Sequence, residues 1–199
     1  MRRSLRAKRR ALSSREQKLA ARRLCRLLLC QPLFIRSRHI AFYLPNDGEI
    51  DPRPLIVAAQ RLGKHCYLPV LAPGNVNRLW FVRYTDSTPM VKNRYGISEP
   101  RPDFRRRRRA QDLDLVLLPL VGFDRFGGRM GMGGGFYDRS FSFKQHVNAH
   151  KPYLIGLAHG CQQVDRLKLA SWDIPLGAVA TDGDLFHPPG SFTQREFLK

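Results

Sequence analysis

The apolar segment "LDLVLLPL" at residues 113–120 is followed closely by "RMGMGGGFYDR" at residues 129–139. A continuous apolar run of this length is typical of a parallel strand that is buried on both faces. Four glycines in residues 131–135 then let the backbone turn and approach a ligand. We therefore expect a central strand whose carboxyl end opens into a glycine-rich loop, where α/β sheets collect their ligands.

Strand-like and helix-like patterns alternate along the rest of the chain. Apolar runs predict strands at 39–44, 64–70, 79–84, 153–158 and 178–181. Residues 51–62 predict a helix that begins at proline and ends at Gly63, and a further helix is expected from the glycines to about residue 149. This alternation predicts a single α/β domain over residues 1–199, with a central, mostly parallel sheet flanked by helices in a Rossmann-like three-layer arrangement.

Three other segments have their own signals. Residues 1–31 predict a basic N-terminal helix, which the capping-box pattern "SSRE" at 13–16 can restart. Residues 93–109 lack periodicity and are predicted to be a long loop with a basic end. The tail from about 187 to 199 is interrupted by proline and glycine, and we expect it to be weakly ordered.

Composition limits the classes of function. No apolar run reaches the roughly 18 residues of a membrane span, and no signal peptide is visible. The arginine-rich start resembles a mitochondrial transit peptide as well as a first helix, but four scattered cysteines favour a reducing cytoplasm over a disulfide or zinc framework. The net charge of +19 allows nucleic acid, an anionic membrane surface or small polyanionic substrates as partners.

The glycine stretch favours a phosphate and metal site over a purely structural turn. Its spacing fits neither the dinucleotide fingerprint nor the Walker loop. Its flanks are informative, because Arg129 and Arg139 can neutralise phosphate oxygens and Asp138 can hold Mg²⁺. Asp124 adds a carboxylate in the same neighbourhood.

Two further groups of arginines stand out. Arg2 and Arg6 are four residues apart, so on a helix they form either a solvated face or a clamp on the same phosphates. Arg105 to Arg109 form a run of five, which usually stays mobile and faces water. RNA binding and attraction of a polyanionic substrate are the alternatives, but no stacking-aromatic pattern of an RNA-binding sheet accompanies the run.

Other catalytic signals are absent or weak. There is no Gly-x-Ser-x-Gly of a serine hydrolase, and His146 with His150 lacks the glutamate of a zinc-protease motif. His159 fits a satisfied buried histidine better than a catalytic base. Trp80 and Trp172 are predicted to be core or pocket aromatics.

Taken together, the segments resemble the 5-formyltetrahydrofolate cyclo-ligase family, also called methenyltetrahydrofolate synthetases. The resemblance rests on "LPLVGFD" at 118–124 and "GGRMGMGGGFYDR" at 127–139. Further similar segments follow in the family's order, namely "RRSLR" at 2–6, "YLPNDGEID" at 43–51, "GKHCYLPV" at 63–70, "NRYGISEP" at 93–100, "IGLAHGCQ" at 155–162 and "WDIPLGAVAT" at 172–181.

The resemblance implies an enzyme that uses ATP and Mg²⁺ to convert 5-formyltetrahydrofolate to 5,10-methenyltetrahydrofolate, with release of ADP and phosphate. It implies that the formyl oxygen takes the γ-phosphoryl group and that N10 of the folate then closes the ring. Phosphoryl transfer needs positioning and charge stabilisation more than a protein nucleophile, which suits a chain without an obvious one. The same resemblance implies two small-molecule substrates, ATP and 5-formyltetrahydrofolate, no membrane partner and a monomeric state. The alternative is a basic RNA-associated binding protein that keeps the fold without the catalysis.

The resemblance also implies roles for individual residues. Catalytic roles fall to Arg129, Tyr137 and Asp138, and metal binding to Asp138 and Asp173. The implied ATP-binding set is Arg2, Arg6, Arg129, Met130, Gly131, Met132, Gly133, Gly134, Gly135, Phe136 and Tyr137. The implied folate-binding set is Leu44, Glu49, Met132, Gly133, Gly134, Gly135 and Phe136.

Three positions depart from the family pattern. Arg2 stands where the family often has lysine, and Phe136 where tyrosine is common. Gly177 occupies a position that often carries aspartate, so the metal contribution of that region rests on Asp173. The run Arg105 to Arg109 acquires one further hypothesis, which is long-range attraction of the polyglutamate tails of cellular folates.

Overall fold

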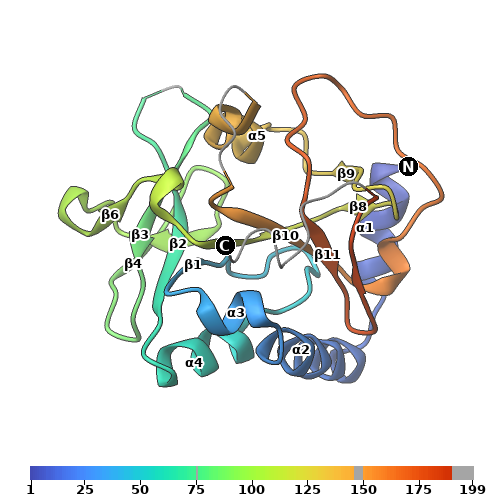
Figure 1. Ribbon diagram of the computed structural model, residues 1–199, viewed down its shortest axis with the longest axis horizontal. Helices are drawn as coiled ribbons and strands as arrows, with labels where there is room; N and C mark the ends of the chain where they lie inside the picture. Colours follow the sequence, from blue (N-terminus) through green and yellow to red (C-terminus); the bar gives the residue numbers. More distant parts are fainter. Residues whose placement is uncertain (75, 146–149, 190–199) are drawn as a thin grey trace.

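The computed structural model describes residues 1–74, 76–145 and 150–189, and its centre is an eight-stranded sheet. The spatial order of the strands is β12-β11-β10-β7-β1-β2-β3-β6 (Figure 1). Their bounds are β1 His39–Ala41, β2 His65–Leu71, β3 Leu79–Arg83, β6 Arg107–Arg108, β7 Leu115–Pro119, β10 Tyr153–Leu157, β11 Ala178–Ala180 and β12 Leu185–Phe186. Two hairpins stand apart from this sheet, namely β4 Met90–Lys92 with β5 Ser98–Pro100, and β8 Gly122–Phe123 with β9 Arg129–Met130.

The five inner strands are parallel, and β7 lies at their centre. Strand β7 pairs with β10 over Leu115–Pro119 and with β1 at Leu115 and Val116. Strands β3, β6 and β12 join antiparallel at the two edges. The predicted α/β fold with a mostly parallel sheet is therefore confirmed, and the expected central strand is β7.

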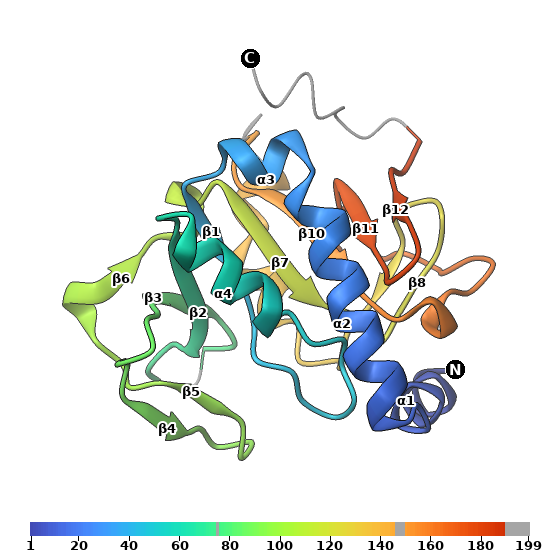
Figure 2. The same cartoon turned by 90° about the horizontal axis from the view of Figure 1, so that it is seen from below.

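Helices cover one face of the sheet more completely than the other. Helices α2 Ser14–Leu29, α3 Pro32–Arg36 and α4 Arg53–Arg61 lie together under the sheet (Figures 1 and 2). Their apolar side chains join one buried cluster with the strands, including Leu24, Phe34 and Leu55. The short helix α5 Phe136–Ser140 and the connecting segments cover the opposite face, where Phe141 belongs to a second cluster. The three layers place the carboxyl end of β7 beneath the glycine loop.

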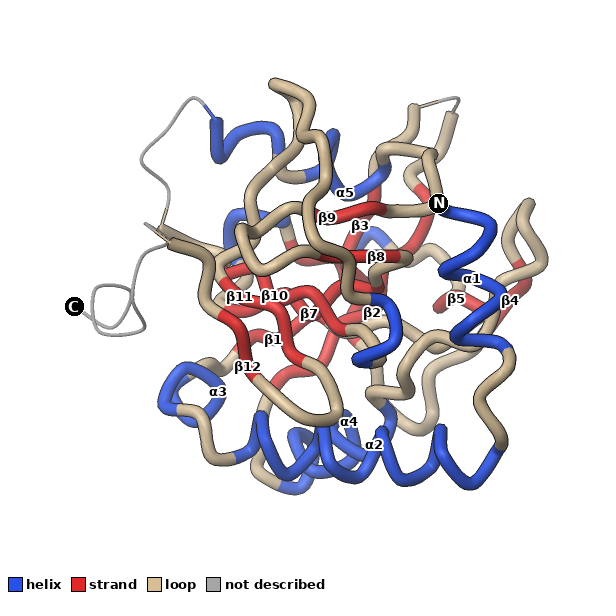
Figure 3. The backbone as a smooth tube through the Cα atoms, turned by 90° about the vertical axis from the view of Figure 1, so that its right-hand side faces the viewer, coloured by secondary structure: helices blue, strands red, loops and turns tan. Residues whose placement is uncertain are grey.

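The N-terminal segment forms two helices rather than one. Helix α1 Arg2–Arg10 ends before the Ser13 cap, and the Ser13–Glu16 capping box starts α2 as the sequence indicates. Helix α1 lies apart from α2 and beside the β8–β9 hairpin (Figure 3). The break therefore lets a basic helix reach the glycine loop while α2 packs under the sheet.

Two other predicted segments are corrected. Residues 93–109 are not one long loop, because β5 and β6 fall within them. The helix expected to reach about residue 149 is the five-residue α5, followed by a 3₁₀ turn at Ser142–Gln145. Strands β5 and β6 are short and depend on pairing, so the sequence pattern misses them. Helix α5 is short and begins at a glycine turn, and the sequence pattern extends it too far. Residues 146–149 and most of the predicted weakly ordered tail lie outside the described residues.

Two chemical features of the described chain complete the fold. Cys25, Cys30, Cys66 and Cys161 are all free thiols. Across the described ranges, no helix has both the length and the apolar character needed to cross a bilayer.

Candidate active site

The β8–β9 hairpin, which leads into the glycine loop, is held in place by one buried carboxylate and one close helix contact. Asp124 is 2% exposed, and its carboxylate accepts hydrogen bonds from the backbone N–H groups of Phe126, Gly128 and Leu167, each at 2.8 Å. A side chain at Gly122 would begin 2.6 Å from Leu5 of α1, so glycine there lets the helix dock. Asp124 therefore organises the turn between β8 and β9, and this second carboxylate expected near Asp138 is engaged with backbone groups.

The loop adopts a conformation that needs glycine at particular positions. Gly133 has φ of 100° and Gly135 has φ of 63°, both in the left-handed region that side chains disfavour. The Gly134 carbonyl accepts hydrogen bonds from Arg139 at 2.7 Å and from Asn77 at 3.3 Å. Helix α5 is only five residues long, so positive potential here comes chiefly from the arginines rather than from a helix dipole.

Arg2 lies beside the glycine loop. Its Nε donates to the Gly131 carbonyl at 2.9 Å, across 129 residues of sequence. Arg6, by contrast, donates to the Asp47 carboxylate at 2.7 Å. The structure therefore brings Arg2 to the glycines and directs Arg6 toward the turn that carries Glu49.

Arg129 and Asp138 form the central ion pair of the site. The Arg129 side chain is 8% exposed and bonds the Asp138 carboxylate, which also accepts the Ile174 N–H at 3.3 Å. Burial lowers the pKa of Arg129, and the charges of Asp138 and Asp173 oppose that shift. Among the described residues, the second terminal nitrogen of Arg129 is buried with no hydrogen-bond partner. One donor nitrogen of this guanidinium thus lacks an acceptor, and an anionic ligand at the loop would supply one.

The two predicted metal ligands lie near Arg129, but they do not form a protein-only cage. Asp173 accepts the Ala170 N–H at 2.8 Å and acts electrostatically on Arg129 alongside Asp138. Within the described ranges there is no group of three or more His, Cys, Asp or Glu suited to a metal. At Gly177 an added side chain would begin 2.4 Å from the Tyr153 ring, whose hydroxyl bonds the Gly177 carbonyl. The Tyr153 ring therefore fills the space that a carboxylate at 177 would need.

Glu49 is half-buried in a turn between β1 and α4. Burial raises the pKa of Glu49 to about 7, although the positive charge of Arg9 opposes the shift. Burial also raises the pKa of Tyr137, and the charge of Glu49 adds to it, so these two side chains share one electrostatic environment. The predicted folate residue Glu49 and the predicted catalytic residue Tyr137 are thereby linked.

Arg9 is a component of this region that the sequence analysis missed. It is 0% exposed, and its guanidinium donates to the Asp47 carbonyl at 2.8 Å, the Asp47 carboxylate at 3.0 Å and the Leu120 carbonyl at 2.9 Å. It also lies 3.6 Å from the Glu49 carboxylate. Arg9 follows the buried Leu5 by one helical turn, and that i, i+4 spacing is the signal that it faces inward.

Leu44 lines a surface hollow that the sequence does not indicate. The hollow has a volume of about 310 Å³ and lies between the turn after β1 and the β4–β5 hairpin. The hairpin turn reaches the glycine loop, because Arg94 bonds Asn77 at 3.3 Å and Tyr95 meets Phe136 edge-on at 6.0 Å. The residues that line the hollow are Leu44, Pro45, Asn46, Arg53, Gly96, Ile97 and Ser98.

The remaining loop residues vary in exposure. Met132 is exposed at the loop tip, whereas Met130 in β9 and Phe136 in α5 are half-buried. His159 is buried as predicted, and burial lowers the pKa of its imidazole, but within the described residues its Nε2 has no hydrogen-bond partner, so the prediction that it is satisfied is wrong. Trp172 is exposed and Trp80 lies beneath Arg107, so neither belongs to the core clusters.

Known proteins resemble this chain in sequence and in fold. A model of the 5-formyltetrahydrofolate cyclo-ligase family matches residues 1–182. The 5-formyltetrahydrofolate cyclo-ligase of Escherichia coli (strain K12) is 41% identical over 177 residues, which cover 89% of this chain and 96% of that protein. The protein of the same name from Haemophilus influenzae is 42% identical over 142 residues, covering 71% of this chain and 74% of that protein.

Solved structures agree with these relatives. The NMR structure of Aquifex aeolicus 5,10-methenyltetrahydrofolate synthetase matches with a TM-score of 0.79 and 27% identity, over 96% of this chain and 93% of that chain. The structure of a synthetase of the same name from Mycoplasma pneumoniae, at 22% identity and a TM-score of 0.70, supports the fold alone. The family model covers most of the sequence, and the Escherichia coli relative is 41% identical over 89% of this chain. The chain therefore belongs to the 5-formyltetrahydrofolate cyclo-ligase family.

Proposed function

We propose that this chain converts 5-formyltetrahydrofolate to 5,10-methenyltetrahydrofolate in an ATP- and Mg²⁺-dependent reaction that releases ADP and phosphate. The observation that carries the proposal is the ion pair of the largely buried Arg129 side chain with Asp138, beside a loop built on left-handed glycines. Arg129 retains a buried donor without a partner among the described residues, and a phosphate oxygen is the acceptor that would satisfy it.

ATP is proposed to lie along the glycine loop, residues 130–137. Gly133 and Gly135 allow the backbone to approach the phosphates closely, and Arg2 stands beside Gly131 to add charge. Arg6 is proposed to act from the neighbouring turn, where it now holds Asp47. Arg129 is proposed to stabilise the charge that develops on the transferred phosphoryl group.

The donor set near Arg129 fits a magnesium ion that arrives with the nucleotide. Mg²⁺ is usually held by one or two carboxylates together with substrate phosphates and water, and Asp138 and Asp173 are two carboxylates close to one buried arginine. When bound, the ion would reduce the negative charge of the phosphates. We propose Asp138 as its main protein ligand and Asp173 as the second.

Folate is proposed to bind on the Glu49 side of the loop. The Glu49 carboxylate can accept hydrogen bonds from the pterin's amino-pyrimidine edge, while Leu44 and the loop residues Met132 to Phe136 supply contact surface. The formyl oxygen would attack the γ-phosphorus, forming an O–P bond as ADP leaves. N10 would then attack the formyl carbon, lose its proton, and expel phosphate as the ring closes.

We propose that the reaction takes place in the cytoplasm and that the chain acts as a monomer. Free thiols at all four cysteines are consistent with a reducing compartment. We further propose that the run Arg105 to Arg109 attracts polyglutamylated substrate through its long-range field. Serine at these five positions should raise KM for polyglutamylated more than for monoglutamylated substrate, most clearly at low salt; equal effects on both would reject this role.

The test of the main proposal is formation of methenyltetrahydrofolate, followed by its absorbance. Product should appear only when folded protein, 5-formyltetrahydrofolate, ATP and Mg²⁺ are all present. A folded protein that gives no product with all components is not this enzyme, and the alternative of an RNA-associated binding protein then takes precedence.

Asp138→Asn tests the proposed metal role. Turnover should fall at least about a hundredfold, because a neutral amide binds Mg²⁺ poorly and no longer pairs with Arg129. Asp103→Asn, which alters an exposed partner of Arg106 at the far sheet edge, is the matched control and should keep its activity. Asp138→Asn with unchanged turnover and unchanged dependence on Mg²⁺ would reject the assignment.

A further inference from the structure

A second arginine-lined hollow lies at the β6 edge of the sheet, away from the glycine loop. Its volume is about 330 Å³. In Figures 1 and 2 strand β6 and the β8–β9 hairpin stand on opposite sides of the molecule. The hollow is lined by Tyr67, Arg83, Arg105, Arg106, Arg107 and Arg108, so every charged residue in its lining is an arginine.

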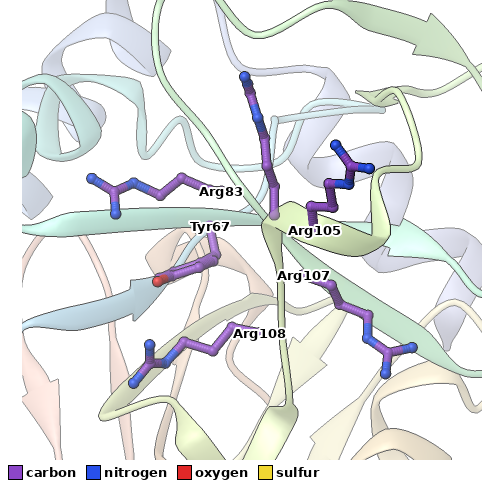
Figure 4. Close-up of a pocket in the computed structure, with 6 residues that line it drawn as sticks. Tyr67, Arg83, Arg105, Arg107 and Arg108 are labelled. Carbon is purple, nitrogen blue, oxygen red and sulfur yellow. The ribbon is translucent and has the colours of Figure 1, made fainter.

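Strand pairing explains how the arginines come together. The 3₁₀ turn Phe104–Arg106 leads into β6, where Arg107 pairs with Val82 and Arg108 with Phe81. Neighbouring residues of a strand point to opposite faces, so Arg107 meets the Trp80 ring at 4.6 Å while Arg108 turns to the other face. Figure 4 shows Arg108 and Arg83 on either side of the Tyr67 ring.

The positive charge of this hollow is only partly compensated by the protein. Arg106 lies 3.4 Å from Asp103, and Arg108 donates to the Asp112 carbonyl at 2.8 Å. Within the described part of the chain, the side chains of Arg83 and Arg105 make no hydrogen bond or ion pair. Like charges gathered without acceptors repel one another, and a bound anion would remove that repulsion.

The positive potential extends from the hollow into the sheet. The Tyr67 hydroxyl lies 3.0 Å from Nδ1 of His39, and His39 stacks on His65 at 4.8 Å. Burial lowers the pKa of His39 to about 4, and the charge of Arg108 is the next contributor. Burial also lowers the pKa of His65, followed by the charge of Arg83. Both imidazoles thus experience the field of arginines that line the hollow.

We propose that this hollow binds a compact polyphosphate anion, such as inorganic triphosphate, at a site distinct from the glycine loop. Guanidinium groups match the oxygens of phosphate in a two-pronged geometry, and five arginines line this hollow without a lining carboxylate. The volume is at the lower end for small-molecule sites, which favours a compact ligand.

The aromatic residues disfavour a nucleic acid as the occupant. Single-stranded nucleic acids are bound by stacking their bases on exposed aromatic rings. Here Tyr67 is only 5% exposed, and one face of Trp80 is covered by Arg107. The hollow therefore offers charge without a free stacking surface.

The test uses Trp80 as a local reporter in the full chain. Trp80 and Trp172 are the two tryptophans, and Trp172→Phe removes the exposed one without touching the core clusters. Inorganic triphosphate should then change Trp80 fluorescence saturably, whereas sulfate at equal ionic strength should not. Arg83→Gln with Arg105→Gln should weaken this response at least tenfold.

Two controls separate this site from other sources of binding. Arg22→Gln with Arg23→Gln on α2 removes the same net charge from another exposed surface and should leave the affinity within about twofold. Arg2→Gln alters the glycine loop and should not change the Trp80 response. Equal weakening by the Arg22 and Arg23 pair, or loss only with Arg2→Gln, would overturn the proposal.

The choice of ligand is tested with two other polyanions. A single-stranded oligonucleotide and an oligo-γ-glutamate chain should each displace triphosphate only at much higher concentration. Tighter binding of either one would replace polyphosphate by that class of ligand and overturn the proposal. If none of the three ligands gives a saturable response, the proposal is also overturned. The arginines would then only protect the sheet edge from pairing with another strand. None of these outcomes depends on the cyclo-ligase activity.

Discussion

The glycine loop with α1 and the β6 edge are both rich in arginine, but they use it differently. Beside the loop, Arg2, Arg9 and Arg129 each have a protein acceptor, a carbonyl or a carboxylate. At the β6 edge, Arg83 and Arg105 make no such contact within the described residues. The density of positive charge in the sequence therefore does not identify the arginines that organise the fold. Those arginines are identified by the acceptors that surround them.

The largest expected effect of this difference is on stability. Arg9→Met should lower the free energy of unfolding by about 3–5 kcal/mol, because it leaves Asp47 and Glu49 without their buried cation. Arg105→Met at the β6 edge should change it by less than about 0.5 kcal/mol. Urea denaturation of both variants measures the contrast, and equal losses would show that the two regions do not differ as described.

The sign of pH-dependent stability should also differ between the regions. Burial raises the pKa of Glu49 from 4.5 to about 7, so the folded state binds a proton more tightly than the unfolded chain. Its contribution to stability is therefore complete below pH 4.5 and is lost as the pH rises to 7, a change of up to roughly 3 kcal/mol. Glu49→Gln should remove this decline, so its stability relative to the parent should rise over that range.

Asp112 at the β6 edge provides the opposite case. Its hydrogen bond from Arg109 lowers the pKa of the carboxyl, so its contribution is present above about pH 3.8 and is lost as the pH falls. Asp112→Asn should accordingly cost stability at neutral pH and less in acid. Unfolding curves from pH 3 to 8 for both variants check the signs, and parallel slopes would contradict the assignment.

Nucleotide affinity should depend on backbone conformation at the loop. Gly133→Ala should raise KM for ATP about tenfold or more, because φ of 100° is strained for alanine. Gly131→Ala, at a neighbouring position with ordinary φ and open space, should raise it less than about threefold. Gly63→Ala imposes similar strain at the end of α4 and should leave KM unchanged; a similar rise there would show that the effect is not local.

The smallest expected effect concerns self-repulsion at the β6 edge. Arg83→Gln with Arg105→Gln should stabilise the fold by a few tenths of a kcal/mol at low salt, and the gain should vanish at high salt. Arg2→Gln should give no such gain, because it removes a hydrogen bond to Gly131. Thermal unfolding at two salt concentrations, without phosphate in the buffer, measures both.

The sequence predicts the inner strands well and the short elements poorly. The apolar run at 113–120 identifies β7, since burial on both faces leaves a continuous pattern. Sequence patterns miss strand β6 because two arginines form it only by pairing with β3, and they do not show that α5, which begins after the left-handed Gly135, ends after five residues. These features depend on contacts that no local pattern contains.

The residues of the candidate site also differ in how far the sequence predicts their roles. Glycines, Arg129 and Asp138 are local in sequence, and their proximity follows from the motif. The buried role of Arg9 depends on acceptors at Asp47 and Leu120, far along the chain. Asp124 was grouped with the metal carboxylates because it follows β7, yet three backbone donors occupy it.

The central position of β7 has a consequence for synthesis on the ribosome. Strand β7 lies between β1, made much earlier, and β10, which follows only after the glycine loop. Arg9 must likewise wait for the Leu120 carbonyl before its guanidinium is fully bonded. The α2–α4 layer can therefore begin to pack while translation continues, whereas α1 completes its contacts only after Gly160–Gln162, which follow β10, have emerged.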